Sequence, residues 1–301
     1  MHTIFITRPL FPHTHEHLSK FFQIGRPRTA EGVITQLTDP VDTRFLDRFP
    51  RLRVISQCAV GVDNIDLSEA GRRGITVMNT PGVLTDAAAD MTWALMLCTA
   101  RRVAEADALC RKGSFSGWGL QFMLGREVTG KTLGIIGPGR IGTAVAARAH
   151  GFRMRVLCSG RRRHHRPSMT SVTLRRLLRE SDFVSLHVPA TPRTRHLIGA
   201  AELALMKPDA ILINTSRGSA VDETALVAAL RTGSLGGAGL DVFEKEPRIP
   251  AALRRNRRVV LTPHIASATL ETRSLMAMTA ARNVIDFFHG VPDPRRVVLG
   301  G

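Results

Sequence analysis

The sequence predicts an α/β protein with two Rossmann-like domains, one flavodoxin-like and discontinuous, the other doubly wound. Short strands rich in β-branched residues alternate with helical stretches, which is typical of parallel sheets covered by helices. The chain has 301 residues, and this length favours two domains over one. Two strand–helix series follow one another, so each domain is expected to hold one of them.

The first series is predicted to consist of short strands followed by one long helix. Thr85–Arg111 is rich in Ala, Leu and Met, and this composition predicts a single, largely buried helix. Phe21–Gly32 lacks room for a complete second strand and helix, so this part of the domain is expected to be abbreviated. The strands are expected at Thr3–Thr7, Val33–Leu37, Arg53–Ser56 and Ile75–Met78.

The second series begins at Thr132 and ends near Pro263, and a last helix is expected at Ser267–His289. Because only one series lies in the middle of the chain, the C-terminal helix is expected to complete the first domain. The predicted domains are therefore residues 1–93 plus 266–301, and residues 94–265. The candidate strands of the second series are Leu133–Ile136, Arg155–Cys158, Phe183–His187, Ala210–Asn214, Gly237–Asp241 and Val259–Leu261.

Composition predicts a soluble cytoplasmic protein. Hydrophobic residues make up 44% and charged residues 22% of the chain, which is ordinary for a globular protein. The N-terminus lacks the apolar stretch of a signal peptide, and the most apolar window, Met91–Ala100, is too short to span a bilayer. The scattered cysteines form no CxxC pair and are expected to be reduced, mostly buried thiols, with no metal site.

The net charge of +17 raises the alternative of nucleic-acid binding, because basic surfaces attract phosphate backbones. However, arginine is spread through every segment, and no zinc-finger spacing or RNA-binding aromatic motif accompanies it. Any such binding is expected to be non-specific and to vanish at moderate salt.

A glycine-rich turn predicts a dinucleotide site. The segment GPGRIG, residues 137–142, follows a predicted strand and opens the predicted helix Arg140–Ala149. Gly137 allows the tight turn, Gly139 lets the backbone approach a pyrophosphate, and Gly142 lets helix and strand pack closely. The helix N-terminus offers free N–H groups to the phosphate. The predicted cofactor-binding residues of this turn are Gly137, Gly139, Arg140, Ile141 and Gly142.

The residues after the next strand favour NADPH over NADH. An NAD site carries Asp or Glu there to accept a hydrogen bond from the ribose 2′-OH. This chain instead has Ser159, Arg161 and Arg162, and guanidinium groups suit a 2′-phosphate. The alternative is a solvated basic loop in an arginine-rich protein.

Three segments near the C-terminal end place unusual residues after predicted strands. Taken singly, Arg217 could form a surface ion pair, Glu246 could lie on a loop, and His264 could be structural. Together they provide the groups for reduction of a keto acid. An arginine binds the carboxylate and polarises the carbonyl, a histidine donates a proton, and a carboxylate keeps that histidine protonated.

These segments resemble the signature segments of the D-isomer-specific 2-hydroxyacid dehydrogenases. The resemblance covers about residues 50–290 in the family's order. It rests on GPGRIG, NTSRGSAVDE, GLDVFEKEP and TPHIAS, together with CAVGVDNID and NTPGVLTD nearer the N-terminus.

The resemblance implies a role for each matching residue. Arg217 would be the catalytic arginine that binds substrate, His264 the acid/base, and Glu246 its paired carboxylate. Asp241 would lie beside the nicotinamide carboxamide. The backbone N–H groups of Val60 and Gly61 would bind the substrate carboxylate. His187, Pro189, Thr194 and Thr215, with Asp241 and His264, complete the predicted cofactor-binding set.

Residues 118–126 resemble the glyoxylate/hydroxypyruvate reductase branch, as does the Ser-Gly-Arg-Arg run. The resemblance implies NADPH-dependent reduction of glyoxylate, hydroxypyruvate or a similar 2-keto acid, bound between the domains of a homodimer. Thr85–Arg111 and Gly113–Arg126 are the expected dimer contact, with Trp118 either reaching the neighbouring subunit or packed in the core. Two alternatives stay open: an NAD-dependent dehydrogenase of lactate, phosphoglycerate, formate or phosphite, and a non-catalytic protein that senses a dinucleotide.

Overall fold

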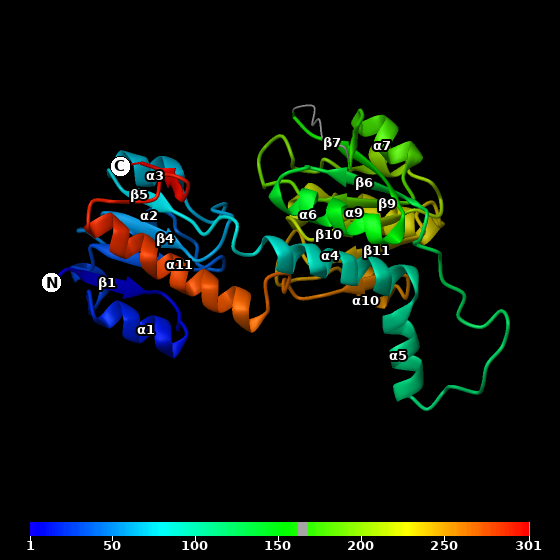
Figure 1. The fold of residues 1–301 in the computed structure, drawn as a ribbon, viewed down its shortest axis with the longest axis horizontal. Coiled ribbons are helices and arrows are strands. Elements are labelled where there is room, and N and C mark those ends of the chain that lie inside the picture. Colours follow the sequence, from blue (N-terminus) through cyan, green and yellow to red (C-terminus); the bar gives the residue numbers. More distant parts are fainter. Residues whose placement is uncertain (162–167, 301) are drawn as a thin grey trace. The chain divides into compact units, whose positions relative to one another are not determined.

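The computed structural model describes residues 1–161 and 168–300, and the described chain divides into two compact units (Figure 1). Unit 1 comprises Met1–Leu84 and Ala268–Gly301, and unit 2 comprises Thr85–Ser267. The α/β fold with two Rossmann-like domains is confirmed. The boundaries expected from the sequence, at residues 93/94 and 265/266, stay a prediction; the compact units divide at residues 84/85 and 267/268.

Unit 1 is a six-stranded sheet with helices on both faces. Its order is β13-β5-β4-β3-β1-β2, and only β13 runs antiparallel to its neighbour. Helices α1 and α11 contribute to the core on one face, and α2 and α3 to the core on the other. The strands are β1 (Thr3–Ile6), β2 (Gln23–Ile24), β3 (Gly32–Thr35), β4 (Val54–Gln57), β5 (Thr76–Met78) and β13 (Val297–Leu299); the helices are α1 (Pro12–Ser19), α2 (Thr43–Leu46), α3 (Leu67–Arg72) and α11 (Leu270–Phe288).

The segment between α1 and β3 is abbreviated, as the sequence predicts. Strand β2 has two residues, and only the 3-10 turn η1 (Pro27–Thr29) connects it to β3. Pro27 fixes the start of this turn, and a Cβ at Gly25 would lie 2.5 Å from Thr3 Cγ2, so the chain passes close to β1 there.

Unit 2 contains a seven-stranded parallel sheet in the order β12-β11-β10-β9-β6-β7-β8. The chain builds outward from β6 through β7 to β8, then returns to β9 and continues to β12 on the other side. The strand order therefore reverses between β6 and β9, which is where doubly wound sheets bind ligands. The strands are β6 (Thr132–Ile136), β7 (Arg155–Ser159), β8 (Thr170–Ser171), β9 (Phe183–Leu186), β10 (Ile211–Asn214), β11 (Gly237–Leu240) and β12 (Val259–Leu261).

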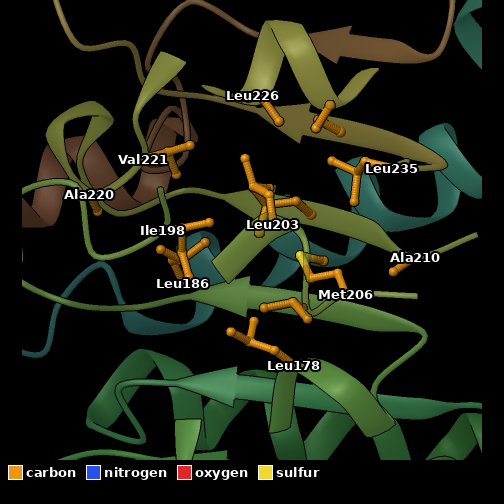
Figure 2. Close-up of a cluster of buried hydrophobic side chains, with 14 of the residues drawn as sticks. Leu178, Leu186, Ile198, Leu203, Met206, Ala210, Ala220, Val221, Leu226 and Leu235 are labelled. Atoms are coloured by element: carbon orange, nitrogen blue, oxygen red, sulfur yellow. The ribbon is translucent and has the colours of Figure 1, made fainter. Parts of the chain in front are cut away.

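Two apolar clusters fix this sheet between its helices. One face packs against α4 and α6, and the other against α7 to α10. Figure 2 shows the cluster on the face covered by α7 to α10, in which Leu178, Leu203 and Leu226 from three helices point toward the strands. The helices are α4 (Thr85–Ala100), α5 (Val103–Arg111), α6 (Arg140–Ala149), α7 (Leu174–Glu180), α8 (Ala200–Leu203), α9 (Glu223–Thr232) and α10 (Ala251–Arg255).

The prediction of one buried helix over Thr85–Arg111 is wrong. Helix α4 ends at Ala100, Arg102 adopts a left-handed φ of 54°, and α5 leaves the layers as a separate helix without a buried residue (Figure 1). The break has a non-local cause. The N–H of Arg126 donates to the carbonyl of Ala100 at 2.7 Å, so a later segment caps the end of α4.

The thiols are less buried than expected: Cys158 is buried, Cys58 and Cys98 are partly buried, and Cys110 is exposed. Cys110 lies on α5, which makes no core contact. Across the part of the chain that the structure describes, no helix is long and apolar enough to cross a membrane.

Candidate active site and dinucleotide site

The glycine turn lies where the strand order of unit 2 reverses. Gly137 follows β6 with a φ of 88°, a left-handed conformation that favours glycine. A Cβ at Gly137 would lie 2.4 Å from the carbonyl oxygen of His187, which follows β9. The chain therefore passes too close to the neighbouring strand end for any side chain at this position.

The two later glycines differ in what surrounds them. A Cβ at Gly142 would lie 2.5 Å from the carbonyl oxygen of Gly137 and 2.9 Å from Ile135 Cγ2, so only glycine fits between helix and strand. A Cβ at Gly139 would meet no described atom within 4 Å, and no described side chain caps this end of α6. The space beside Gly139 at the start of α6 is thus open, which suits a bound pyrophosphate.

The end of β7 carries the residues predicted to select the cofactor. Ser159 is the last residue of β7, and its carbonyl accepts the N–H of Gly137 at 2.9 Å. Arg161 follows as an exposed side chain without an ion pair to any described residue. Arg162 lies outside the described residues.

The remaining predicted cofactor residues lie on the same edge, and several are already hydrogen-bonded. The Thr194 hydroxyl donates to the carbonyl of Pro189 at 2.6 Å, which closes the loop after β9. The Thr215 hydroxyl is 2.8 Å from that of Thr92 on α4. His187 Nε2 is 2.9 Å from Ser185 Oγ, and burial lowers the pKa of His187 to about 3, so this ring is neutral.

Asp241 organises the loop that carries His264. Its carboxylate is buried, and Oδ1 accepts from the Thr262 hydroxyl at 2.6 Å and from the N–H of Ile265 at 2.8 Å. Oδ2 accepts the N–H of Ala266 at 2.8 Å. The carbonyl of Asp241 also accepts the N–H of His264 at 2.8 Å. These bonds hold the segment that follows β12 in one conformation.

His264 and Glu246 form the pair expected from the sequence. His264 Nδ1 is 2.9 Å from Glu246 Oε2, and Glu246 Oε1 accepts the N–H of Phe243 at 3.0 Å. His264 has a left-handed φ of 55°, an uncommon conformation for a residue with a side chain. Since Nδ1 is engaged by the carboxylate, Nε2 is the ring nitrogen available to another molecule.

Glu246 is ionised and lies within reach of the positive charge of Arg217. Burial raises the pKa of Glu246, but the hydrogen bonds from His264 and the Phe243 N–H and the charges of His264 and Arg217 outweigh it. The net effect places the pKa of Glu246 below its ordinary value of 4.5. A negative charge therefore lies against the His264 ring, with Oε2 2.9 Å from Nδ1.

Asn214 shapes the turn of Arg217, a role that the sequence analysis missed. Its Nδ2 donates to the carbonyl of Arg217 at 2.8 Å, and its Oδ1 accepts both the N–H and the hydroxyl of Ser216. Asn214 is buried at the end of β10. An amide side chain at the start of the NTSRG segment was the available signal, because Asn commonly hydrogen-bonds a following turn.

Val60 and Gly61 lie in unit 1, on the loop after β4. Their carbonyl oxygens accept from Asn79 Nδ2 at 2.8 Å and from Gln57 Nε2 at 3.4 Å. Their N–H groups donate to no residue within the described ranges. The loop is therefore held through its carbonyls, which leaves two adjacent donors for an anion.

Within residues 1–161 and 168–300, no group of three or more His, Cys, Asp or Glu side chains is arranged to hold a metal ion.

Comparisons with known proteins agree in family and fold. A family model described as D-isomer specific 2-hydroxyacid dehydrogenase, NAD binding domain, matches residues 93–266. Glyoxylate reductases of Thermococcus litoralis and Aeropyrum pernix are 47% and 48% identical over 98% of this chain, and cover 96% and 95% of their own lengths.

Solved structures extend this similarity to the whole fold. A Thermus thermophilus protein superimposes with a TM-score of 0.92 at 42% identity, over 99% of this chain and 100% of its own. The NADPH-dependent glyoxylate/hydroxypyruvate reductase of Sinorhizobium meliloti, solved with NADP and malonate, superimposes with a TM-score of 0.85 at 34% identity. It covers 95% of this chain and 93% of its own.

Proposed function

Because the chain belongs to the D-isomer-specific 2-hydroxyacid dehydrogenase family, and is thus an NAD(P)-dependent oxidoreductase acting on CH–OH groups, we propose that it reduces glyoxylate, hydroxypyruvate or a similar 2-keto acid with NADPH. The product is the corresponding 2-hydroxy acid, in the D configuration where C2 is chiral. The observation that carries the proposal is the His264–Glu246 pair beside Arg217, on the same sheet edge as the glycine turn.

His264 is the proposed proton donor. The nicotinamide, when bound, supplies the hydride to C2 of the keto acid. His264 Nε2 gives the carbonyl oxygen a proton, so the alkoxide that would otherwise form becomes a hydroxyl. Glu246 stabilises the positive imidazolium before the transfer. In the reverse reaction the neutral imidazole takes the proton back.

Arg217 and the loop after β4 are the proposed substrate-binding groups. A guanidinium suits both the carboxylate and the polarised carbonyl of a keto acid. The N–H groups of Val60 and Gly61 have no acceptor among the described residues, which supports their proposed role of binding the substrate carboxylate.

Asp241 can serve both the loop and the nicotinamide. A carboxylate offers about four acceptor positions, and the structure uses three of them. The remaining position, on Oδ2, suits the amide of a nicotinamide carboxamide, which supports the role expected from the resemblance.

NADPH preference rests on the residues after β7. Ser159 stands where an acid would bind the ribose 2′-OH, and Arg161 extends into solvent nearby. The Thermococcus litoralis and Aeropyrum pernix relatives are glyoxylate reductases, and the Sinorhizobium meliloti relative is NADPH-dependent.

We also propose a homodimer formed through an exposed arm, defined as α5 together with residues 113–126. Trp118 is 84% exposed, so the alternative that it packs in the core of its own chain does not hold. Contiguous exposed apolar residues mark interaction surfaces. The exposed large apolar side chains of the arm are Val103, Phe115, Trp118, Leu120, Phe122 and Leu124.

The first experiment follows absorbance at 340 nm with NADPH or NADH and offers glyoxylate, hydroxypyruvate, pyruvate and phosphohydroxypyruvate in turn. Faster oxidation of NADPH with glyoxylate or hydroxypyruvate is expected. A preference for NADH would contradict the cofactor proposal alone. Binding of a dinucleotide by the folded protein, without turnover of any keto acid, would instead favour a sensing protein.

A further inference from the structure

The loop that carries Glu246 packs directly against the turn that carries Arg217. A Cβ at Gly218 would lie 1.9 Å from the carbonyl carbon of Phe243 and 2.4 Å from the nitrogen of Glu244. The peptide between Phe243 and Glu244 thus occupies the space of the missing side chain. Both faces of this contact belong to unit 2.

The same peptide is held by a carboxylate from α9. Oε1 of Glu223, in the first turn of that helix, accepts the N–H of Glu244 at 2.9 Å. The preceding N–H, that of Phe243, donates to Glu246. Two successive N–H groups therefore have different acceptors: one fixes the loop to α9, and the other fixes Glu246 to the loop.

The side chain of Glu244 provides a further attachment. Its Oε1 is 2.7 Å from His196 Nε2 and 3.3 Å from Arg195 Nη2. The N–H of His196 donates to the carbonyl of Ser219, in the turn that follows Arg217. These bonds join three segments: the loop of Glu246, the turn of Arg217 and the segment at His196. None of these bonds involves the side chain of Arg217, Glu246 or His264.

We propose that Glu223 is a positioning residue, which anchors the loop Phe243–Glu246 to α9 so that the Glu246 carboxylate stays on His264. This inference rests on the proposed function of the His264–Glu246 pair and adds a residue without contact to that pair's reacting atoms. Glu223 follows Arg217 by six positions in the sequence, so one short stretch of chain supports both the substrate-binding arginine and the carboxylate of the acid/base pair.

The surroundings of Glu223 indicate that its role is to accept a hydrogen bond and not to supply a negative charge. Burial raises the pKa of Glu223, and the negative charges of Glu244 and Glu246 raise it further. The hydrogen bond from the Glu244 N–H and the positive charge of Lys245 lower it. The net effect is a raised pKa. A carboxylate here is disfavoured by its acidic neighbours, so a neutral acceptor in the same position serves the anchor at least as well.

The test compares Glu223→Ala, which removes the acceptor, with Glu223→Gln, which keeps an amide oxygen and removes the charge. Glu202→Ala is the matched control, because Glu202 also accepts a backbone N–H in the first turn of a helix, from Gly199 at 3.2 Å. Rates are measured from pH 5 to 9 with NADPH and the best keto acid. Hydrogen exchange of the peptide that covers residues 243–246 is measured in parallel, without substrate.

Glu223→Ala is expected to lower kcat/KM about tenfold, chiefly through kcat, because the acid/base pair is less well held. Exchange at residues 243–246 should rise. Glu223→Gln should restore both readouts to within about threefold of wild type, and Glu202→Ala should match wild type.

Three results would overturn the inference. If Glu223→Gln loses as much activity as Glu223→Ala, the charge is what matters. If Glu202→Ala lowers kcat/KM as much as Glu223→Ala does, the effect is general loss of stability. If exchange at residues 243–246 stays unchanged in Glu223→Ala, the anchor is absent. Lack of keto-acid turnover by wild type would contradict the proposed function instead, and the exchange measurement would still test the anchor.

Discussion

At the residue scale, the His264–Glu246 pair places a carboxylate against the ring that gives up the proton. The pKa of Glu246 lies below 4.5, so its carboxylate is negative throughout the neutral range. Protonation of Glu246 removes that charge, and the lowered pKa confines this loss to acidic pH, below the ordinary value of 4.5. Replacement of Glu246 by Gln removes the charge at every pH.

Glu246→Gln should therefore lower kcat by about 10²-fold in the neutral range, within the range of general acid–base contributions, while unfolding by urea changes little. His264→Asn should lower kcat at least as much. A kcat of Glu246→Gln close to that of wild type would show that the carboxylate only orients the ring.

A second prediction at this scale concerns the cofactor. Arg161→Ala should raise the KM for NADPH about tenfold and leave the KM for NADH unchanged, because only NADPH carries the 2′-phosphate. Arg175→Ala, an exposed arginine on α7, is the matched control for loss of one positive charge. Equal changes in KM for both cofactors, or the same change in the control, would mean that Arg161 acts only through the overall charge.

The sequence predicts the reacting residues of the site better than it predicts their supports. Arg217, Glu246 and His264 lie in compact motifs whose residue types match a known chemistry, and the structure brings Glu246 and His264 together. Asn214 forms local hydrogen bonds to Ser216 and Arg217, which the position of an Asn before the turn could have signalled. Glu223 instead accepts the N–H of Glu244, 21 residues later in the chain. That bond depends on where a loop returns in space, and neither composition nor spacing encodes this position.

At the element scale, the turn from β6 into α6 contains one glycine that is needed for packing, Gly142, and one that is expected to be needed for binding, Gly139. Gly142→Ala places a Cβ against the Gly137 carbonyl and Ile135, so it should destabilise the fold by about 1–3 kcal/mol, measured by urea unfolding. Gly139→Ala meets no described atom and should leave stability unchanged, while it weakens dinucleotide binding about tenfold by obstructing the phosphate.

Gly151→Ala is the control for this pair, because a Cβ there also meets nothing within 4 Å and Gly151 lies past the other end of α6. It should change neither stability nor binding. If Gly139→Ala bound NADPH as tightly as Gly151→Ala, the phosphate would have to lie elsewhere.

Most strands are predictable at this scale because their apolar runs and turn residues are local signals. The α4–α5 break is not, since Arg101 and Arg102 are good helix formers without glycine or proline nearby. Gly125 reaches the end of α4, where a Cβ would lie 2.5 Å from the Ala100 carbonyl oxygen. The helix ends there because a distant segment replaces its next hydrogen bond, and tertiary contact outweighs propensity.

At the scale of the whole molecule, the exposed arm predicts self-association. Leu120→Glu with Leu124→Glu should convert a dimer to a monomer in sedimentation velocity, because two charges would be buried in an apolar contact. Leu270→Glu, at an exposed leucine on α11, is the control and should leave the dimer intact. A monomeric wild type at micromolar concentration would contradict the dimer proposal.

The chain passes from unit 1 to unit 2 and back, and this has a consequence for synthesis on the ribosome. Unit 2 is continuous, so it can fold once residue 267 has emerged, whereas unit 1 needs α11 and β13, which follow unit 2 in the sequence. Until then the Ser56 hydroxyl lacks the Ala280 carbonyl, and the Asn79 carbonyl lacks the amide of Asn283. The strands β1 to β5 thus lack α11 and β13 while the whole of unit 2 is made, and chaperones have that interval in which to bind them.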